Sequence, residues 1–248
     1  MSGSFGSPRA LARLAGAMYI VTGGTALIGE MYVRGTLIVR GDPAATASNI
    51  LANRTLWRAG GVADLVAASG DAILALLFFV LLAGVSRPLA LLAAFFRLTH
   101  VAVLATTTLL HFAPLVYLSP VTPLKGLSTP ALEALAFASL RTHAIGYNIA
   151  LFFFGLTCIT LGVLIARSGF LPRVIGVWLA IGGAAYVANS VVHLLAPAYG
   201  AQFFRYVLVP CALGELVLIL WLLIAGLNEE RWKDQLRTAS SGMNPGTR

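Results

Sequence analysis

Charged residues are scarce in this chain of 248 residues: 10% are Asp, Glu, Lys or Arg, whereas 58% are hydrophobic. In an ordinary soluble domain, about 25% of the residues are charged. The mean hydropathy of +0.87 agrees with this scarcity. The composition excludes a soluble domain and predicts an integral membrane protein.

Cysteine is almost absent, and so are the signatures of nucleotide, metal or nucleic-acid binding. Cys158 and Cys211 lie in separate apolar segments without the spacing of a metal or redox motif, so we expect them to be packing residues. No glycine-rich phosphate loop follows a strand. The net charge of +8 comes from cations scattered singly between apolar runs. We therefore expect lipid headgroups as partners, no nucleic acid and no cofactor.

Apolar runs dominate what is present, and six of them reach the length of about 20 residues that a helix needs to cross a bilayer. They cover residues 11–33, 60–85, 88–118, 142–166, 171–195 and 203–227. Because they are hydrophobic nearly all round, they are typical of bilayer spans. The sequence thus predicts an all-α, polytopic integral membrane helical bundle with about six transmembrane helices.

The predicted spans form a single domain over residues 11–227, between an N-terminal tail (1–10) and a polar tail (228–248). The polar tail lacks apolar periodicity, so we expect it to be disordered. Between the first two spans, Asp42 is a good N-cap and Pro43 a good first helical residue. They predict a short interfacial helix there, and residues 131–140 predict another.

Cations near the span ends predict the orientation. With both termini in the cytoplasm, the inner segments carry nine Lys and Arg residues and the outer segments seven. The sequence therefore predicts a multi-pass protein of the bacterial inner membrane with both termini inside.

A long series of residues resembles the domain-of-unknown-function 4386 family of bacterial membrane proteins. The matching residues are Ala12-Arg13-Leu14-Ala15-Gly16, Glu30, Arg34, Leu37-Ile38-Val39, Gly41-Asp42, Ala45-Thr46-Ala47, Asn49-Ile50, Arg58, Asp64-Leu65, Arg97-Leu98, His143, Gly146-Tyr147, Phe153-Phe154-Gly155, Ser168-Gly169-Phe170-Leu171-Pro172-Arg173, Gly182-Gly183, Tyr186 and Glu215. The resemblance implies a multi-spanning fold and no assigned activity. Asp71, His100, His111 and His193 do not fall on this pattern.

An ionisable side chain in the middle of a span costs at least ~2.5 kcal/mol, so each one needs a partner, water or a function. One group is expected near the outer ends of the spans and to face a polar pocket that opens outward. Its members are Glu30, Arg34, Arg58, Asp64, His143, Tyr147 and, at the end of the fifth span, His193.

A second group is expected deeper in the spans and comprises Asp71, Arg97, His100 and Glu215. Arg97 stays protonated in essentially any protein environment, so it must pair with a carboxylate. Asp71 and Glu215 are the candidates.

Three functions are compatible with these residues. The first is binding of a small or lipid-like molecule, with or without acid/base catalysis on a lipid or isoprenoid substrate. Glu30, Asp64, His143 and Glu215 are its candidate catalytic residues, and Arg34, Arg58, Arg97 and Tyr147 its candidate ligand contacts. Carboxyl groups in apolar surroundings can stay protonated and act as acids.

The second is a transporter or sensor of a small solute or protons, and a structural module with buried ion pairs is a related alternative. The third is a metal or haem site on His100, His111, His143 and His193. No local motif such as His-Glu-x-x-His supports it, so we expect no metal.

Overall fold

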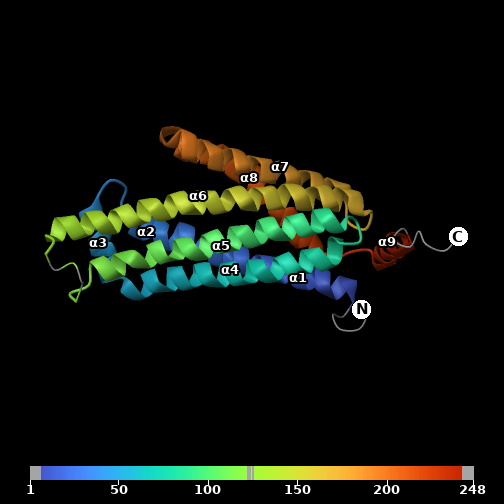
Figure 1. Ribbon diagram of the computed structural model, residues 1–248, viewed down its shortest axis with the longest axis horizontal. Coiled ribbons are helices and arrows are strands. Elements are labelled where there is room, and N and C mark those ends of the chain that lie inside the picture. Colours follow the sequence, from blue (N-terminus) through green and yellow to red (C-terminus); the bar gives the residue numbers. More distant parts are fainter. Residues whose placement is uncertain (1–6, 122–123, 125, 242–248) are drawn as a thin grey trace. The chain divides into compact units, whose positions relative to one another are not determined.

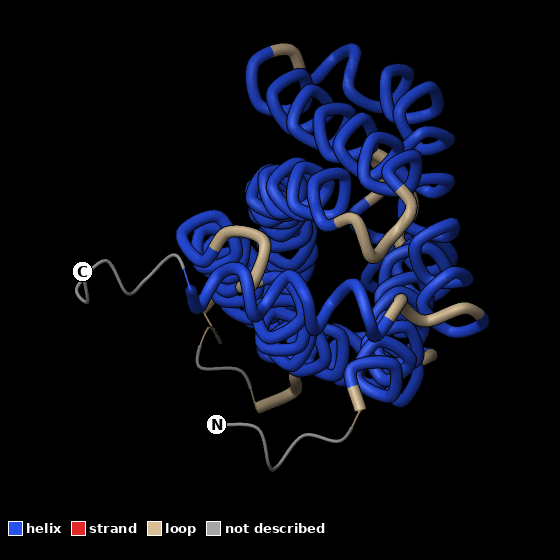
Figure 2. The backbone as a smooth tube through the Cα atoms, turned by 90° about the vertical axis from the view of Figure 1, so that its right-hand side faces the viewer, coloured by secondary structure: helices blue, strands red, loops and turns tan. Residues whose placement is uncertain are grey.

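The computed structural model describes residues 7–121, 124 and 126–241, apart from the side chains of 201–205, 208 and 239–241. Every regular element in this part of the chain is a helix, as Figure 2 shows, and it contains no strand. The all-α prediction is confirmed.

The helices follow one another along the chain with short connections (Figure 1). They are α1 (Pro8–Leu27), the π-helix η1 (Ile28–Arg34), α2 (Gly35–Leu37), α3 (Pro43–Ala52), α4 (Arg54–Leu82), α5 (Arg87–Tyr117), α6 (Thr129–Ser168), α7 (Arg173–Leu195), α8 (Pro197–Ile224) and α9 (Glu229–Ser241).

Within the described residues, five helical segments are long and apolar enough to cross a membrane. They are Pro8–Leu37, Arg54–Leu82, Arg87–Tyr117, Thr129–Ser168 and Arg173–Leu195. Val209–Ile224 passes the same test only together with Glu229–Thr238, across a bend of 102°, and would be the sixth. The multi-spanning prediction is therefore confirmed as five to six spans. Lys125 and Arg248, two of the cations counted for orientation, lie outside the described residues.

The interfacial helix predicted after the first span is α3. The Asp42 side chain accepts a hydrogen bond from the Ala45 backbone N–H at 2.9 Å, and Pro43 occupies the first helical position. Both features were read from the sequence, because a carboxylate satisfies an N–H group that the helix leaves unpaired. Ile50 of α3 is fully buried.

Two expectations for other segments were wrong. The interfacial helix expected at 131–140 is not separate: α6 continues through it as one helix of 40 residues. No glycine or proline interrupts residues 131–145, so nothing ends the helix there. The tail expected to be disordered forms α9 as far as Ser241. Trp232, on α9, donates its indole N–H to the Leu81 carbonyl oxygen at 2.8 Å.

The chain divides into two compact units, which we name after their buried arginines. The Arg97 unit comprises residues 1–20, 71–100 and 151–248, and the Arg34 unit comprises residues 21–70 and 101–150. The single domain predicted over residues 11–227 stays a prediction.

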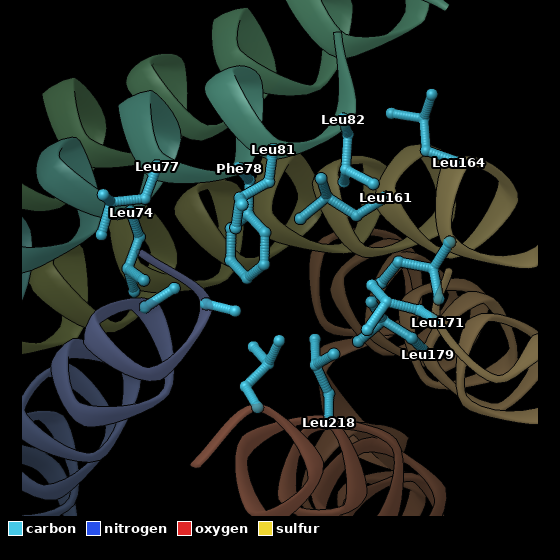
Figure 3. Packing of buried hydrophobic residues seen from close by; sticks show 14 of the residues in the cluster. Leu74, Leu77, Phe78, Leu81, Leu82, Leu161, Leu164, Leu171, Leu179 and Leu218 are labelled. Atoms are coloured by element: carbon cyan, nitrogen blue, oxygen red, sulfur yellow. The ribbon is translucent and has the colours of Figure 1, made fainter. Parts of the chain in front are cut away.

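Leucine and phenylalanine side chains fill the core of the Arg97 unit. Figure 3 shows side chains of α4, α6, α7 and α8 directed toward one another, among them Leu74, Leu161 and Leu218. Between spanning helices there is little hydrophobic driving force, so close packing carries the association. At Gly162 of α6, an added Cβ would lie 2.5 Å from the Gly176 carbonyl oxygen of α7. Only glycine permits that approach.

The Arg34 unit has a smaller core around a tryptophan. Trp57 at the start of α4 is fully buried and belongs to a cluster with Val33, Ile50 and Leu140. This packing fixes η1, α3 and α4 against one another.

Candidate functional site

Arg34 is the last residue of the π-helix that continues α1. Its Nε donates a hydrogen bond to Oε2 of Glu30 at 2.7 Å, across four residues of the same helix. The π-helix is rare and occurs frequently at functional sites, because its wider turn changes the direction of the side chains. A seven-residue π-helix thus presents both charged groups of the first span.

Asp64 of α4 holds the other end of the guanidinium group. Nη1 and Nη2 of Arg34 donate to its two carboxylate oxygens at 2.7 and 2.9 Å, while the two side chains are only 4% and 2% exposed. Such bidentate pairs are among the strongest hydrogen bonds in proteins. A Cβ on Gly29 would lie 2.5 Å from Oδ1 of Asp64, so the close approach requires glycine at that position.

His111 of α5 is held in one orientation and one tautomer by two partners. Nη1 of Arg34 lies 3.2 Å from its Nδ1, and a guanidinium group can only donate, so Nδ1 accepts. The proton is therefore on Nε2, which donates to the Trp57 carbonyl oxygen at 2.8 Å. The Trp57 indole N–H donates in return to the His111 carbonyl oxygen, and the two rings are stacked 4.1 Å apart. His111 is thus neutral.

His143 of α6 is the member of this group whose hydrogen bonding is incomplete. It is buried, its ring centroid lies 6.1 Å from that of His111, and the Tyr147 ring is stacked with it at a centroid distance of 6.3 Å. Its Nε2 has no hydrogen-bond partner among the described residues. Buried polar atoms in proteins are nearly always hydrogen-bonded, so this nitrogen requires water or a ligand.

The net charge of the group is negative. Two carboxylates, Glu30 and Asp64, face one arginine and the neutral His111, which leaves one unit of negative charge among these four residues. Glu30 is the open member: its side chain is 41% exposed, and only Oε2 is engaged with Arg34. We call Glu30, Arg34, Asp64, His111 and His143 the Arg34 cluster.

The structure brings together five of the eight predicted site residues. They are Glu30, Arg34, Asp64, His143 and Tyr147. Arg58 is exposed and makes no ion pair within the described part of the chain. Arg97 and Glu215 belong to the other unit and form a separate group there.

Sequence reasoning placed His111 together with His143 only as part of a possible metal site, and it did not single out Trp57. Arg58 was predicted as a site residue because it is charged. Its neighbour Trp57 is about 100° away around the helix axis, and its side chain faces inward. A buried tryptophan whose indole N–H needs an acceptor is a signal that can be read from sequence. The sequence does not identify which residue accepts this hydrogen bond.

Arg97 of α5 is the centre of the second group. Its Nε lies 3.1 Å from Oδ1 of Asp71 on α4, and its Nη2 binds the same oxygen. His100 Nε2 lies 3.3 Å from the other oxygen of Asp71. The rings of Tyr19, Phe78 and Phe154 lie 5.0, 5.8 and 5.4 Å from the guanidinium carbon. Of the two carboxylates predicted as partners of Arg97, Asp71 and Glu215, the structure pairs it with Asp71.

The histidines do not form one site. His193 belongs to the Arg97 unit, where its Nδ1 lies 3.1 Å from the Asn189 carbonyl oxygen. In the residues that the structure describes, no group of three or more His, Cys, Asp or Glu side chains could hold a metal ion. A cavity of about 400 Å³ is lined by Ser168, Gly169, Arg231, Asp234, Gln235 and Thr238 and includes no residue of the Arg34 cluster.

The sequence matches the family described as Domain of unknown function (DUF4386) over residues 14–226. The chain belongs to this family. Every residue of the Arg34 cluster lies within the part that matches DUF4386, whereas α9 lies beyond it. No curated protein and no solved structure matches the chain.

Proposed function

We propose that this DUF4386 protein binds a small lipid-soluble molecule at the Arg34 cluster, through a polar headgroup that donates a hydrogen bond. The observation that carries the proposal is the unpartnered Nε2 of buried His143 beside the Arg34 ion pairs. An unsatisfied polar atom in a membrane span is costly. A bound headgroup would supply the missing partner.

The charge of the cluster selects the class of headgroup. All three guanidinium nitrogens of Arg34 are already engaged by carboxylates or His111, so little of its positive charge is available. An anionic headgroup would face two carboxylates and one neutralised arginine. A hydroxyl or ammonium group, in contrast, can donate to the open oxygen of Glu30. A hydroxyl oxygen can also accept from His143.

The proposed ligand is therefore a long-chain alcohol or amine that enters from the bilayer. Glu30 and His143 are also the two groups with a free position for proton exchange. Acid/base chemistry on such an alcohol is the enzymatic extension of this proposal. It requires that one of the two accept a proton while the other donates one.

Binding is tested with three ligands of equal chain length: dodecanol, dodecylamine and dodecanoate. Purified protein in nanodiscs is titrated with each, and the melting temperature is recorded. A ligand at one hundred times its Kd stabilises by about 2.7 kcal/mol. We expect dodecanol and dodecylamine to raise the melting temperature and dodecanoate to leave it unchanged.

The variants separate specific binding from solvation of the acyl chain. His143→Phe removes the unpartnered nitrogen and should abolish the alcohol-induced shift, whereas Arg58→Gln, at an exposed position of the same unit, should retain it. Equal shifts with all three ligands, or an unchanged shift in His143→Phe, would show that the cluster is an ion-pair scaffold without a ligand.

A further inference from the structure

Glu215 of α8 is an acidic residue inside an apolar segment. It lies in Val209–Ile224, and within the described residues it takes part in no ion pair. Its Oε1 accepts a hydrogen bond from the Tyr186 hydroxyl of α7 at 2.7 Å. Glu215 is partly buried, whereas Asp64 and Asp71 are buried and each contact an arginine.

Arg97, the cation that interacts with Glu215, is already paired with Asp71. Asp71 takes two nitrogens of Arg97, and three aromatic rings surround the guanidinium group. Arg97 and Asp71 are together neutral. A second carboxylate near them has no charge left to balance it.

Titratable groups of six helices interact with Glu215. The titratable groups that interact with it are Tyr19 of α1, Asp71 of α4, Arg97 of α5, Cys158 of α6, Tyr186 of α7 and Cys211 of α8. Arg97 is the only cation among them, and its partner is an anion. The other four are neutral groups.

An uncompensated carboxylate in an apolar medium lowers its free energy by taking up a proton. Tyrosine, the partner that Glu215 has, can bond a neutral carboxyl group as well as an ionised one. Acids inside spans without a cation partner are typical of proton-binding sites. We propose that Glu215 is a proton-binding site, protonated at neutral pH in the folded protein.

This site is independent of the ligand proposed for the Arg34 cluster, because it lies in the other unit and uses none of the same residues. It gives the Arg97 unit a group that can take up a proton as pH falls and release it as pH rises. The reaction is the protonation of one carboxylate oxygen by a proton from water. No other co-reactant is needed.

Infrared spectroscopy detects the proton directly, because a protonated carboxyl group has a carbonyl stretching band that a carboxylate lacks. The difference spectrum of wild type minus Glu215→Gln at neutral pH should contain this band. In wild type, the band should disappear as the pH is raised. Tyr186→Phe should move the band to higher frequency, since the hydrogen bond to the carboxyl group is lost.

Thermal stability provides a second readout. The amide in Glu215→Gln is neutral, like the proposed acid, so its melting temperature should stay within ~2 °C of wild type. Asp71→Asn is the matched control in the same unit. Its melting temperature should fall much further, because the substitution leaves Arg97 without its carboxylate. If no carboxyl band is present in wild type at neutral pH, or if Glu215→Gln is destabilised as much as Asp71→Asn, Glu215 is ionised and the proposal is wrong.

Discussion

Arg34 and Arg97 are both buried arginines in spanning helices, yet their surroundings differ. Arg34 contacts two carboxylates and a neutral histidine, and one of these carboxylates is 41% exposed. Arg97 contacts one carboxylate and three aromatic rings, and its side chain is 1% exposed. In each case one buried aspartate, Asp64 or Asp71, balances the positive charge of the arginine. The further partners differ: Arg34 has the partly exposed Glu30, whereas Arg97 has aromatic rings.

The Arg97 pair should therefore have the larger effect on folding. Asp71→Asn leaves Arg97 buried without a counter-charge, and breaking a buried pair costs about 3–5 kcal/mol. We expect a loss of this size in the free energy of unfolding, measured in mixed micelles with increasing denaturing detergent.

A double variant sharpens this prediction. Asp71→Leu combined with Arg97→Met removes both charges and should recover most of the stability, since apolar replacement of a buried pair is often neutral. Recovery identifies the pair as structural. A double variant as unstable as Asp71→Asn would instead mean that the pair contributes more than charge balance.

Asp64→Asn should have an intermediate effect, because Arg34 keeps Glu30 as a second carboxylate. Loss of hydrogen bonds to a charged group costs about 1.5–3 kcal/mol. The same unfolding measurement should place this variant between wild type and Asp71→Asn. If Asp64→Asn is the more damaging of the two, the compensation by Glu30 does not exist.

Glu30→Gln should have the smallest effect on stability. Glu30 is the partly exposed member of its pair, so water can replace much of the interaction, and Asp64 remains bonded to Arg34. The variant should nonetheless weaken dodecylamine binding, because it removes the negative charge of the open carboxylate. Unchanged amine binding would remove Glu30 from the proposed site.

Much of the fold follows from the sequence because the bilayer imposes simple constraints. The long apolar windows predicted the spans, and Asp42 with Pro43 predicted α3. The α9 helix was missed because its average composition is polar. Trp232 and Leu236, four residues apart, nevertheless place two apolar side chains on one face of it.

The site was predictable only in part. Arg97 had to find a carboxylate, and Arg34 lies four residues after Glu30, so both ion pairs could be anticipated from charge and spacing. The reciprocal bonds between Trp57 and His111 depend on the contact of two helices 54 residues apart in the chain. Spacing along the sequence carries no information about such a contact.

The most direct test of an open Arg34 cluster and a closed Arg97 cluster is the Kd of dodecanol for three proteins, measured by titration in nanodiscs. Wild type should bind, Tyr186→Phe in the Arg97 unit should bind equally well, and His143→Phe should bind at least tenfold more weakly, a difference of about 1.4 kcal/mol. The account is contradicted if His143→Phe binds like wild type, or if Tyr186→Phe loses as much affinity as His143→Phe.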